Sequence, residues 1–228
     1  LVLVGRRASA LEETIEVIRE NKEDSGGVAL KAVAADVALP EGWSKIRESL
    51  PLDAELSALV HNAGVIEPIK PVAQLTPAEM RHVFSVNTEG PLFLTNELAT
   101  HLERKGDSRV LFIGSGAAHN AYHSWGAYCA SKAALSMVWR SFKTERPIPG
   151  ALYASVRPGQ VDTPMQDTIR SIEHPNVEKF RETKAANKLI SVEELSRFLE
   201  FVLYDTDAGE FEEKEWDVRD QDHQHRWN

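Results

Sequence analysis

The sequence predicts a doubly wound α/β fold, in which helices cover both faces of a parallel sheet. Short apolar runs alternate with stretches of helical periodicity along the whole chain, as a series of strand–helix–strand units requires. Polar or glycine-containing segments follow several of the apolar runs, and parallel sheets bind ligands beyond the carboxyl ends of their strands. The chain has no internal repeat and no linker, so we expect a single domain over residues 1–228.

The first half of the chain contains three expected strands and four expected helices. Apolar runs predict the strands, and apolar residues that recur on one helical face predict the helices. The strands are Leu1–Val4, Val28–Ala34 and Leu56–His61; the helices are Ala8–Asn21, Glu41–Leu50, one from Thr76 toward Val86, and Pro91–Arg104. Thr76, Pro77 and Glu79 predict a capping box with proline at the first helical position.

The same signals continue through the second half. Pro158 and Gly159 end an expected strand there, because neither residue continues a strand easily. The expected strands are Arg109–Ile113, Ala154–Val156 and Glu215–Val218, and the expected helices are Ala127–Thr144 and Ser191–Leu203.

Composition limits the classes of function. The formal net charge of −9 argues against a nucleic-acid partner, because phosphate binding favours a basic surface. No segment approaches the roughly 20 apolar residues of a membrane span. The single cysteine, Cys129, suits a reducing compartment and is expected to be a small packing residue. We therefore expect a soluble cytoplasmic protein with no membrane or nucleic-acid partner.

Four polar residues stand out as a group. Tyr128 and Lys132 are one turn apart on an expected helix, and Ser115 follows the expected strand that ends at Ile113. With Asn87 upstream, they resemble, in type and order, the Asn-Ser-Tyr-Lys tetrad of the short-chain dehydrogenase/reductase family. Tyr-x-x-x-Lys alone is a weak pattern that is common on exposed helices, so the resemblance depends on further motifs.

Those motifs occur in the family's order along the chain, and the resemblance extends from Leu1 to Asp220. The resemblance implies that Asp36-Val37 contacts the adenine and that the Asn62-Ala63-Gly64 turn supports the adenosine side. His61 stands before this turn, where the family more commonly has asparagine. The nicotinamide carboxamide would be oriented by the last motif, which comprises Pro158, Gly159, Val161 and Thr163.

The resemblance also implies a role for each member of the tetrad in a carbonyl reduction. Tyr128 is the general acid, and Lys132 favours its phenolate and binds the cofactor ribose. Ser115 donates a hydrogen bond to the substrate oxygen, and Asn87 holds a proton-relaying water. His119 and His123 lie near Tyr128 in the sequence, but no histidine base is needed where Tyr128 and Lys132 already serve.

Arg6 and Arg7 predict the cofactor. NAD-selective members carry an acidic residue after this strand, whereas a 2′-phosphate is bound by arginine. This chain has Gly5-Arg6-Arg7 and no acid there, so NADP(H) is expected. The alternative is that the two arginines belong to a solvated turn.

Within the family, the chain is most similar to the sepiapterin reductase and benzil reductase branch. The segments Trp125–Ala134, Pro158–Gln166 and Asn187–Glu194 carry this similarity. The expected substrate is a small ketone, diketone, aldehyde or pterin side-chain carbonyl. The expected substrate contacts are Trp125, Met165, Gln166 and Asp217, although Trp125 is equally well interpreted as a packing residue.

The resemblance also implies a homodimer or homotetramer, formed through helices Pro91–Arg104 and Ala127–Thr144. No metal is expected. His223 and His225 are two residues apart in a polar terminal segment with no further ligand nearby, and we expect them to be solvated.

One family motif is missing. The sequence contains no Gly-x-x-x-Gly-x-Gly turn to receive the cofactor pyrophosphate, and its first residues match the family's second strand. We therefore expect a Rossmann-like reductase domain that is N-terminally truncated relative to the family, lacks the usual first strand, and binds NADP(H) weakly. The alternative is a catalytically idle relative that acts as a binding or regulatory protein.

Overall fold

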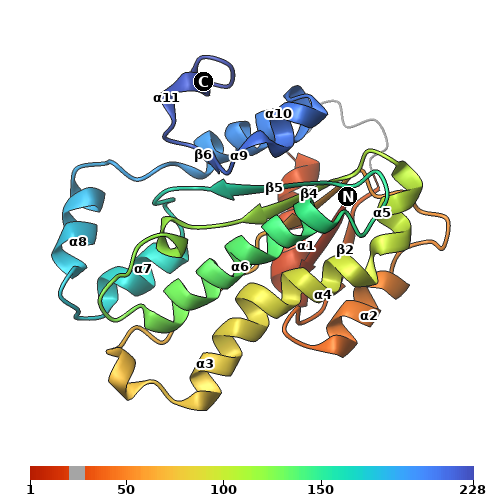
Figure 1. The fold of residues 1–228 in the computed structure, drawn as a ribbon. Coiled ribbons are helices and arrows are strands. Elements are labelled where there is room, and N and C mark those ends of the chain that lie inside the picture. Colours follow the sequence, from red (N-terminus) through yellow and green to blue (C-terminus); the bar gives the residue numbers. More distant parts are fainter. Residues whose placement is uncertain (21–28) are drawn as a thin grey trace.

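The computed structural model of the chain describes residues 1–20 and 29–228, and it has the alternating strands and helices of an α/β fold (Figure 1). Every strand pairs in parallel with its neighbour, which confirms the expected fold class. The strands are β1 (Val2–Gly5), β2 (Lys31–Ala34), β3 (Ala58–His61), β4 (Arg109–Ile113), β5 (Leu152–Arg157) and β6 (Trp216–Asp217).

The described strands form two sheets rather than one. β1 pairs with β2, and the second sheet has the order β3-β4-β5-β6. No strand of the described residues pairs with the free edge of β1 or with that of β3. The side chains of Val4 on β1 and Val60 on β3 are 36% and 40% exposed. This exposure is unusual for apolar residues of parallel strands, which are normally covered on both faces.

One layer of helices covers a face of both sheets. It comprises α2 (Pro40–Glu48), α4 (Gly90–Glu97), α5 (Ala99–Lys105) and α6 (Gly126–Glu145). Its core includes Val33 of β2 together with Val110 and Phe112 of β4, so a single apolar cluster joins the two sheets.

A second apolar cluster covers the other face of β4, β5 and β6. It includes Leu111, Ala154 and Trp216 from the strands, packed against aromatic residues of α9 (Val192–Glu200), of the π-helical turn Phe201–Asp205 and of α10 (Ala208–Glu213). Helix α1 (Ala8–Glu20) packs on β1 and β2. Residues of β1 and β3 do not belong to this second cluster.

Further helices lie around these layers. Helix α3 (Pro77–Phe84) begins with the predicted capping box, in which the Glu79 amide donates to Thr76 Oγ1 at 3.3 Å. Helices α7 (Pro164–Ser171) and α8 (Val177–Ala185) lie beyond the carboxyl ends of β4 and β5 (Figure 1). The sequence signals did not predict α7, α8, α10 or the short α11 (Gln221–Gln224).

The boundaries differ from the predictions at a few places. The expected helix Pro91–Arg104 is two helices, α4 and α5, which meet at Leu98 because its backbone (φ −95°, ψ 7°) leaves the helical region. Asn21, the expected end of the first helix, and Val28, the expected start of the second strand, lie outside the described residues. None of the described helices has the length and apolar character that a bilayer span requires.

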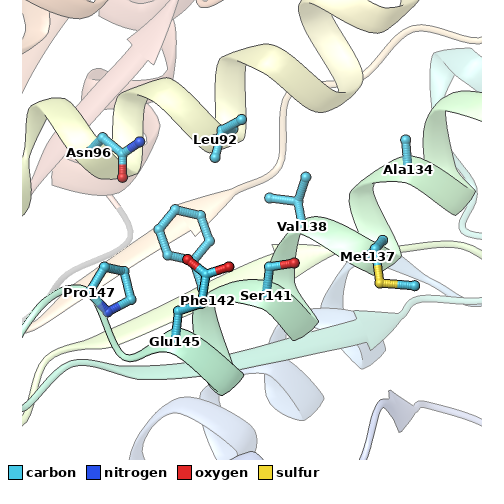
Figure 2. A pocket seen from close by; sticks show the side chains of 9 residues that line it. All are labelled: Leu92, Asn96, Ala134, Met137, Val138, Ser141, Phe142, Glu145 and Pro147. Atoms are coloured by element: carbon cyan, nitrogen blue, oxygen red, sulfur yellow. The ribbon is translucent and has the colours of Figure 1, made fainter.

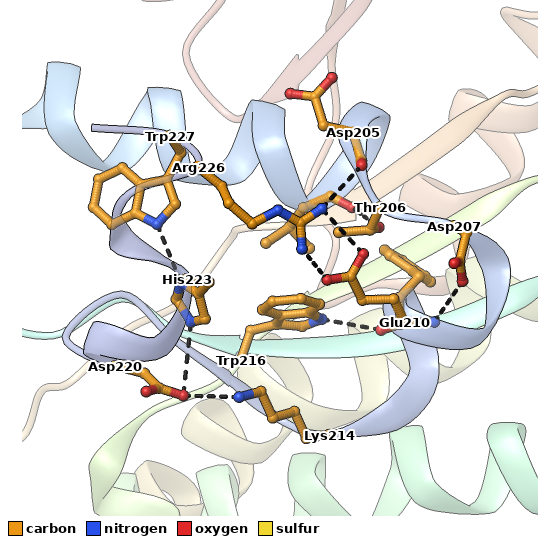
Figure 3. A network of polar contacts seen from close by, with 12 residues as sticks. Asp205, Thr206, Asp207, Glu210, Lys214, Trp216, Asp220, His223, Arg226 and Trp227 are labelled. Carbon is orange, nitrogen blue, oxygen red and sulfur yellow. Dashed lines mark hydrogen bonds and ion pairs between the residues drawn. The ribbon is translucent and has the colours of Figure 1, made fainter.

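The C-terminal segment is packed against the protein, so the expectation that His223 is solvated is wrong. The His223 ring is 4% exposed and stacks on Phe198 with their centres 5.3 Å apart. Trp227 Nε1 donates to His223 Nδ1 at 3.1 Å (Figure 3). The packing partners are distant in sequence, so the polar tail gave no local sign of burial. No metal-binding group of three or more ligands occurs among the described residues.

A buried histidine ends β3. His61 is 7% exposed, and its Nε2 lies 2.7 Å from Thr95 Oγ1. Thr95 Oγ1 donates its own proton to the Pro91 carbonyl at 2.8 Å, so His61 Nε2 must be the donor to Thr95. Burial lowers the pKa of His61 to about 3, because the charged imidazolium would lose its hydration.

His61 predicts a loss of stability in mild acid. The unfolded chain takes up this proton near pH 6.5, whereas the folded chain takes it up only near pH 3, so stability falls as the pH drops between these values. We expect a contribution of about 2 kcal/mol to the loss between pH 6.5 and 4.5. His61→Gln, which keeps a side-chain N–H donor, should flatten this dependence in urea unfolding. Parallel curves for the two proteins would contradict the prediction.

Candidate active site

The structure brings Ser115, Tyr128 and Lys132 together. Tyr128 and Lys132 lie on α6, where both are buried, and the Tyr128 phenol is hydrogen-bonded to Ser115 at the end of β4. Lys132 Nζ lies 5.9 Å from the centre of the Tyr128 ring and donates to the Ile113 carbonyl at 2.8 Å. A hydroxyl, a phenol and an ammonium therefore share one place at the carboxyl edge of the sheet.

Burial changes the acidity of both helical residues. It raises the pKa of the Tyr128 phenol, and the hydrogen bond with Ser115 opposes this effect only partly. It lowers the pKa of Lys132 to about 8. The sequence argument expected the lysine to favour the phenolate, but desolvation of the phenol is the larger effect in this structure. A protonated phenol at neutral pH is the form that a proton donor requires.

Asn87 connects the site to the turn after β3. It lies in a π-helical turn, η2 (Ser85–Glu89), and such turns occur frequently at functional sites. Its Nδ2 donates to the Val65 carbonyl at 2.8 Å and to Ser131 Oγ at 2.9 Å, and its Oδ1 accepts from the Val65 amide at 2.8 Å. The side chain thereby ties the chain after β3 to α6. Its expected role in holding a water stays a prediction.

The expected cofactor residues other than Lys132, which lies on α6, follow carboxyl ends of parallel strands. Asp36-Val37 follows β2, and the Asn62-Ala63-Gly64 turn follows β3. A Cβ atom at Gly64 would lie 3.5 Å from Asn87 Oδ1 and 3.8 Å from Lys132 Nζ, so the turn passes close to the Lys132 ammonium. These positions agree with the rule for ligand sites in doubly wound sheets.

The chain after β5 is held in an unusual conformation. Gly159 has φ +71°, and a Cβ atom there would lie 2.5 Å from Ile190 Cδ1, so both the backbone and the space favour glycine. Val161 is buried and pairs with Ile190 in an isolated bridge. Thr163 precedes α7, and its Oγ1 donates to the Val161 carbonyl at 3.3 Å. Pro158 is partly buried.

Arg6 and Arg7 stand between β1 and α1. Both side chains are exposed, and neither has an ion-pair partner within the part of the chain that the structure describes. Two guanidinium groups beside a helix N-terminus suit an anionic group, because the helix dipole adds to their positive charge.

Trp125 lies between Tyr128 and helix α8. Its ring meets Tyr128 edge-on with centres 5.9 Å apart, and it lies 5.3 Å from the Phe180 ring. Met165 packs on the same cluster. The structure thus brings Trp125 and Met165 to the tetrad. Sequence reasoning missed Phe180 and His174, which also contacts Trp125, because no motif or periodicity marked their segment.

Several buried polar atoms near this cluster have no partner among the described residues. They include Trp125 Nε1, Gln166 Oε1 and His174 Nδ1, in side chains that are less than a tenth exposed. Buried polar groups are normally hydrogen-bonded, so these atoms are available to a bound ligand.

Asp217 has charged partners of its own. Its carboxylate accepts from Arg219 Nε at 2.9 Å and from Arg219 NH2 at 2.7 Å, and Arg157 NH2 lies 3.1 Å away. Burial acts to raise the pKa of Asp217, but the hydrogen bonds from Arg219 and the charge of Arg157 lower it. No recorded contact links Asp217 to Tyr128 among the described residues, and its role as a substrate anchor stays a prediction.

The family model described as short chain dehydrogenase matches residues 1–174. An uncharacterised oxidoreductase of Schizosaccharomyces pombe is 31% identical over 167 residues, which cover 71% of the chain and 66% of that protein. A benzil reductase ((S)-benzoin forming) of Bacillus cereus is 32% identical over 216 residues, covering 85% and 86%. A sepiapterin reductase of Xenopus laevis is 32% identical over 175 residues, covering 73% and 65%. The chain therefore spans about two thirds of the length of two of these relatives.

Solved structures show the same fold. A short-chain dehydrogenase/reductase from Saccharomyces cerevisiae has a TM-score of 0.82 at 23% identity, covering 96% of the chain and 85% of that protein. A short-chain dehydrogenase from Shigella flexneri, solved in complex with NADP, has a TM-score of 0.79 at 19% identity, covering 96% and 86%.

Proposed function

The chain belongs to the short-chain dehydrogenase/reductase family, and we propose that it is an NADP(H)-dependent reductase of small carbonyl compounds. The observation that carries this proposal is the placement of the Ser115 hydroxyl, the Tyr128 phenol and the Lys132 ammonium at one edge of the sheet. The benzil reductase and sepiapterin reductase relatives support the carbonyl substrate class.

The residues after the strands suit a nicotinamide cofactor over most of its length. Arg6 and Arg7 would bind the 2′-phosphate, and Asp36-Val37 with Asn62–Gly64 would contact the adenosine. Lys132 would bind the nicotinamide ribose, and Pro158, Gly159, Val161 and Thr163 would contact the carboxamide. The cofactor supplies the hydride that reduces the carbonyl carbon.

The protein's own residues complete the reduction. As the carbonyl carbon gains its new C–H bond, the carbonyl π electrons move to oxygen, and Ser115 donates a hydrogen bond to the developing charge. The Tyr128 phenol transfers its proton to this oxygen, which leaves a phenolate. The Lys132 ammonium stabilises the phenolate until a solvent proton replaces the lost one.

The substrate pocket is proposed to lie against Trp125 and Met165. An aromatic or planar substrate would stack on the Trp125 ring, and the unpartnered Gln166 Oε1 would accept a hydrogen bond from a polar substituent. A ketone, diketone or aldehyde fits this description. We also propose a reducing cytoplasmic location, because the chain has a single cysteine.

A face of α4 and α6 is proposed to pair two copies of the chain. An apolar pocket of about 570 Å³ lies between these helices (Figure 2), and Met137 at its edge is 59% exposed. A homodimer or homotetramer through this face would cover it. Met137→Glu should convert the oligomer to monomer in light scattering, because a carboxylate would be buried there without a partner. A wild-type monomer would contradict the proposal.

We also propose that the free sheet edges can accept a further strand. The unpaired edges of β1 and β3, with the exposed Val4 and Val60 beside them, support a place for one more strand and a covering helix. A second candidate function is that of a catalytically idle binding or regulatory relative of the family.

Tyr128 tests the reductase proposal. Tyr128→Phe should lower kcat for diketone reduction by about 10²–10⁴-fold, because the transition state loses its proton donor. Tyr204→Phe is the control, since it removes a phenol that is 68% exposed and lies in the π-helical turn Phe201–Asp205, outside the tetrad and the proposed pocket. NADPH oxidation in the presence of benzil measures both variants. Equal activity of Tyr128→Phe and the wild type would contradict the assignment.

The lowered pKa of Lys132 predicts how kcat/KM for the reduction depends on pH. Its pKa of about 8 means that the ammonium loses its proton as the pH rises through 8. We expect kcat/KM for reduction to fall above this pH, since kcat/KM reports ionisations of the free enzyme. Lys132→Arg should have a lower maximum but no fall near pH 8, because guanidinium stays charged. A fall at the same pH in the variant would contradict the prediction.

The variant Arg6→Ala tests which nicotinamide nucleotide the protein prefers. We expect the protein to bind NADPH more tightly than NADH in fluorescence titrations, and Arg6→Ala to weaken NADPH binding about tenfold while leaving NADH unchanged. Arg19→Ala, an exposed change at the far end of α1, is the control. Placing a designed strand, Gly-rich turn and helix before Leu1 should tighten binding of both nucleotides.

The outcomes separate the two candidate functions. NADPH binding that is weakened in Arg6→Ala would support the cofactor assignment. Nucleotide binding that is not tightened by the designed unit would contradict the proposed place for a further strand. No binding of either nucleotide by a folded sample, with or without the designed unit, would favour the idle relative.

A further inference from the structure

A carboxylate outside the tetrad lies beneath the turn that carries Ser115. Glu215, just before β6, has a side chain that is 10% exposed. Its Oε1 accepts from Ser155 Oγ of β5 at 3.2 Å, and its Oε2 lies 2.7 Å from His119 Nε2. Arg157 Nε is 3.7 Å from the same Oε2. One buried group therefore joins the end of the sheet to the residue that follows η3 (Gly116–Ala118).

The same carboxylate also touches the beginning of this turn. A Cβ atom at Gly114 would lie 3.1 Å from Glu215 Oε1 and 2.7 Å from Ser155 Oγ, so only glycine lets the backbone approach this pair. The Gly114 amide donates to the Val156 carbonyl at 2.8 Å. Contacts with Glu215 thus occur on both sides of Ser115, at Gly114 before it and at His119 after it.

Ser115 itself has few other constraints. Its backbone is extended (φ −165°, ψ 150°), and its Oγ accepts from the Ala117 amide at 3.1 Å within the same short turn. The only side-chain partner recorded for it in the described chain is the Tyr128 phenol. The direction of the Ser115 hydroxyl therefore depends on how the segment 114–119 is held against the sheet.

We propose that Glu215 is a positioning residue of the active site, which fixes the segment 114–119 so that Ser115 Oγ faces the substrate oxygen. This inference rests on the proposed reductase function. A charged acceptor suits the task, because hydrogen bonds to a carboxylate are stronger than those to a neutral acceptor and leave the bonded groups less freedom. Displacing a hydrogen-bond donor by about 1 Å costs about a hundredfold in rate.

Glu215→Gln tests the role with little change of volume. The glutamine amide keeps one oxygen acceptor and replaces the other carboxylate oxygen with an NH2 donor. Only one of the two residues, His119 or Ser155, can then keep its present hydrogen bond to an acceptor oxygen at position 215. We expect kcat for benzil reduction to fall about tenfold or more while the dissociation constant of NADPH stays unchanged. Glu213→Gln removes the same charge two residues earlier, from an exposed side chain, and should leave kcat unchanged.

A double-mutant cycle distinguishes an effect on the position of Ser115 from an unspecific loss of activity. If Glu215 acts through Ser115, Glu215→Gln should cause no further loss of kcat in a Ser115→Ala background. The same fold-loss in both backgrounds would overturn the proposal, as would an equal loss in Glu213→Gln.

Hydrogen exchange provides a readout that does not require activity. In Glu215→Gln the amides of residues 114–121 should exchange faster than in the wild type, while those of β4 stay protected. His119→Gln, at a side chain that is 35% exposed, should give the same local effect if Glu215→Gln does not fold. Unchanged exchange in a folded variant would overturn the proposal. A wild type that exchanges as expected but reduces no carbonyl would instead contradict the proposed function alone.

Discussion

The site depends on how the Lys132 ammonium is buried. A buried cation is costly unless acceptors surround it, and the carbonyl of Ile113, at the end of β4, supplies one at 2.8 Å. This bond fixes α6 against β4 at one register. Tyr128, one turn before the lysine, then faces Ser115, which is two residues beyond Ile113. Asn87 holds the neighbouring turn against the same helix through Ser131. Loss of this anchor would disconnect the phenol from the hydroxyl.

The sheet around this anchor is unevenly supported. β4 and β5 are covered on both faces, by the layer that contains α6 and by the aromatic cluster around Trp216. β1 and β3 share only the first of these layers, and each has a free edge. The proposed catalytic residues, on α6 and just after β4, therefore lie in the well-packed region. The proposed phosphate contacts of Arg6 and Arg7 rest on the less supported pair β1–β2.

The sequence predicted well what local patterns encode. The parallel strands and the Thr76 capping box followed from periodicity and residue type, and the gathering of Ser115, Tyr128 and Lys132 from the resemblance to the family. It could not predict features that arise from contacts between distant segments. Helices α7 and α8 carry residues of the proposed pocket, which become neighbours of Trp125 only through tertiary packing. His223 is buried because Phe198, Phe201 and Trp216 pack against its ring. The raised pKa of Tyr128 likewise reflects burial, which spacing does not reveal.

The most direct test of the central claim is transfer of the hydride itself. The protein would be incubated with benzil and NADPH that carries deuterium at C4 of the nicotinamide, in separate samples for each face of the ring, and the product analysed by mass spectrometry. Hydride chemistry at this site predicts one deuterium on the carbinol carbon from one of the two labelled faces. The labelled product should form about 10²–10⁴-fold more slowly when Tyr128 is replaced by phenylalanine. A folded sample that binds NADPH but transfers no label to benzil or to other small diketones, ketones and aldehydes would contradict the account.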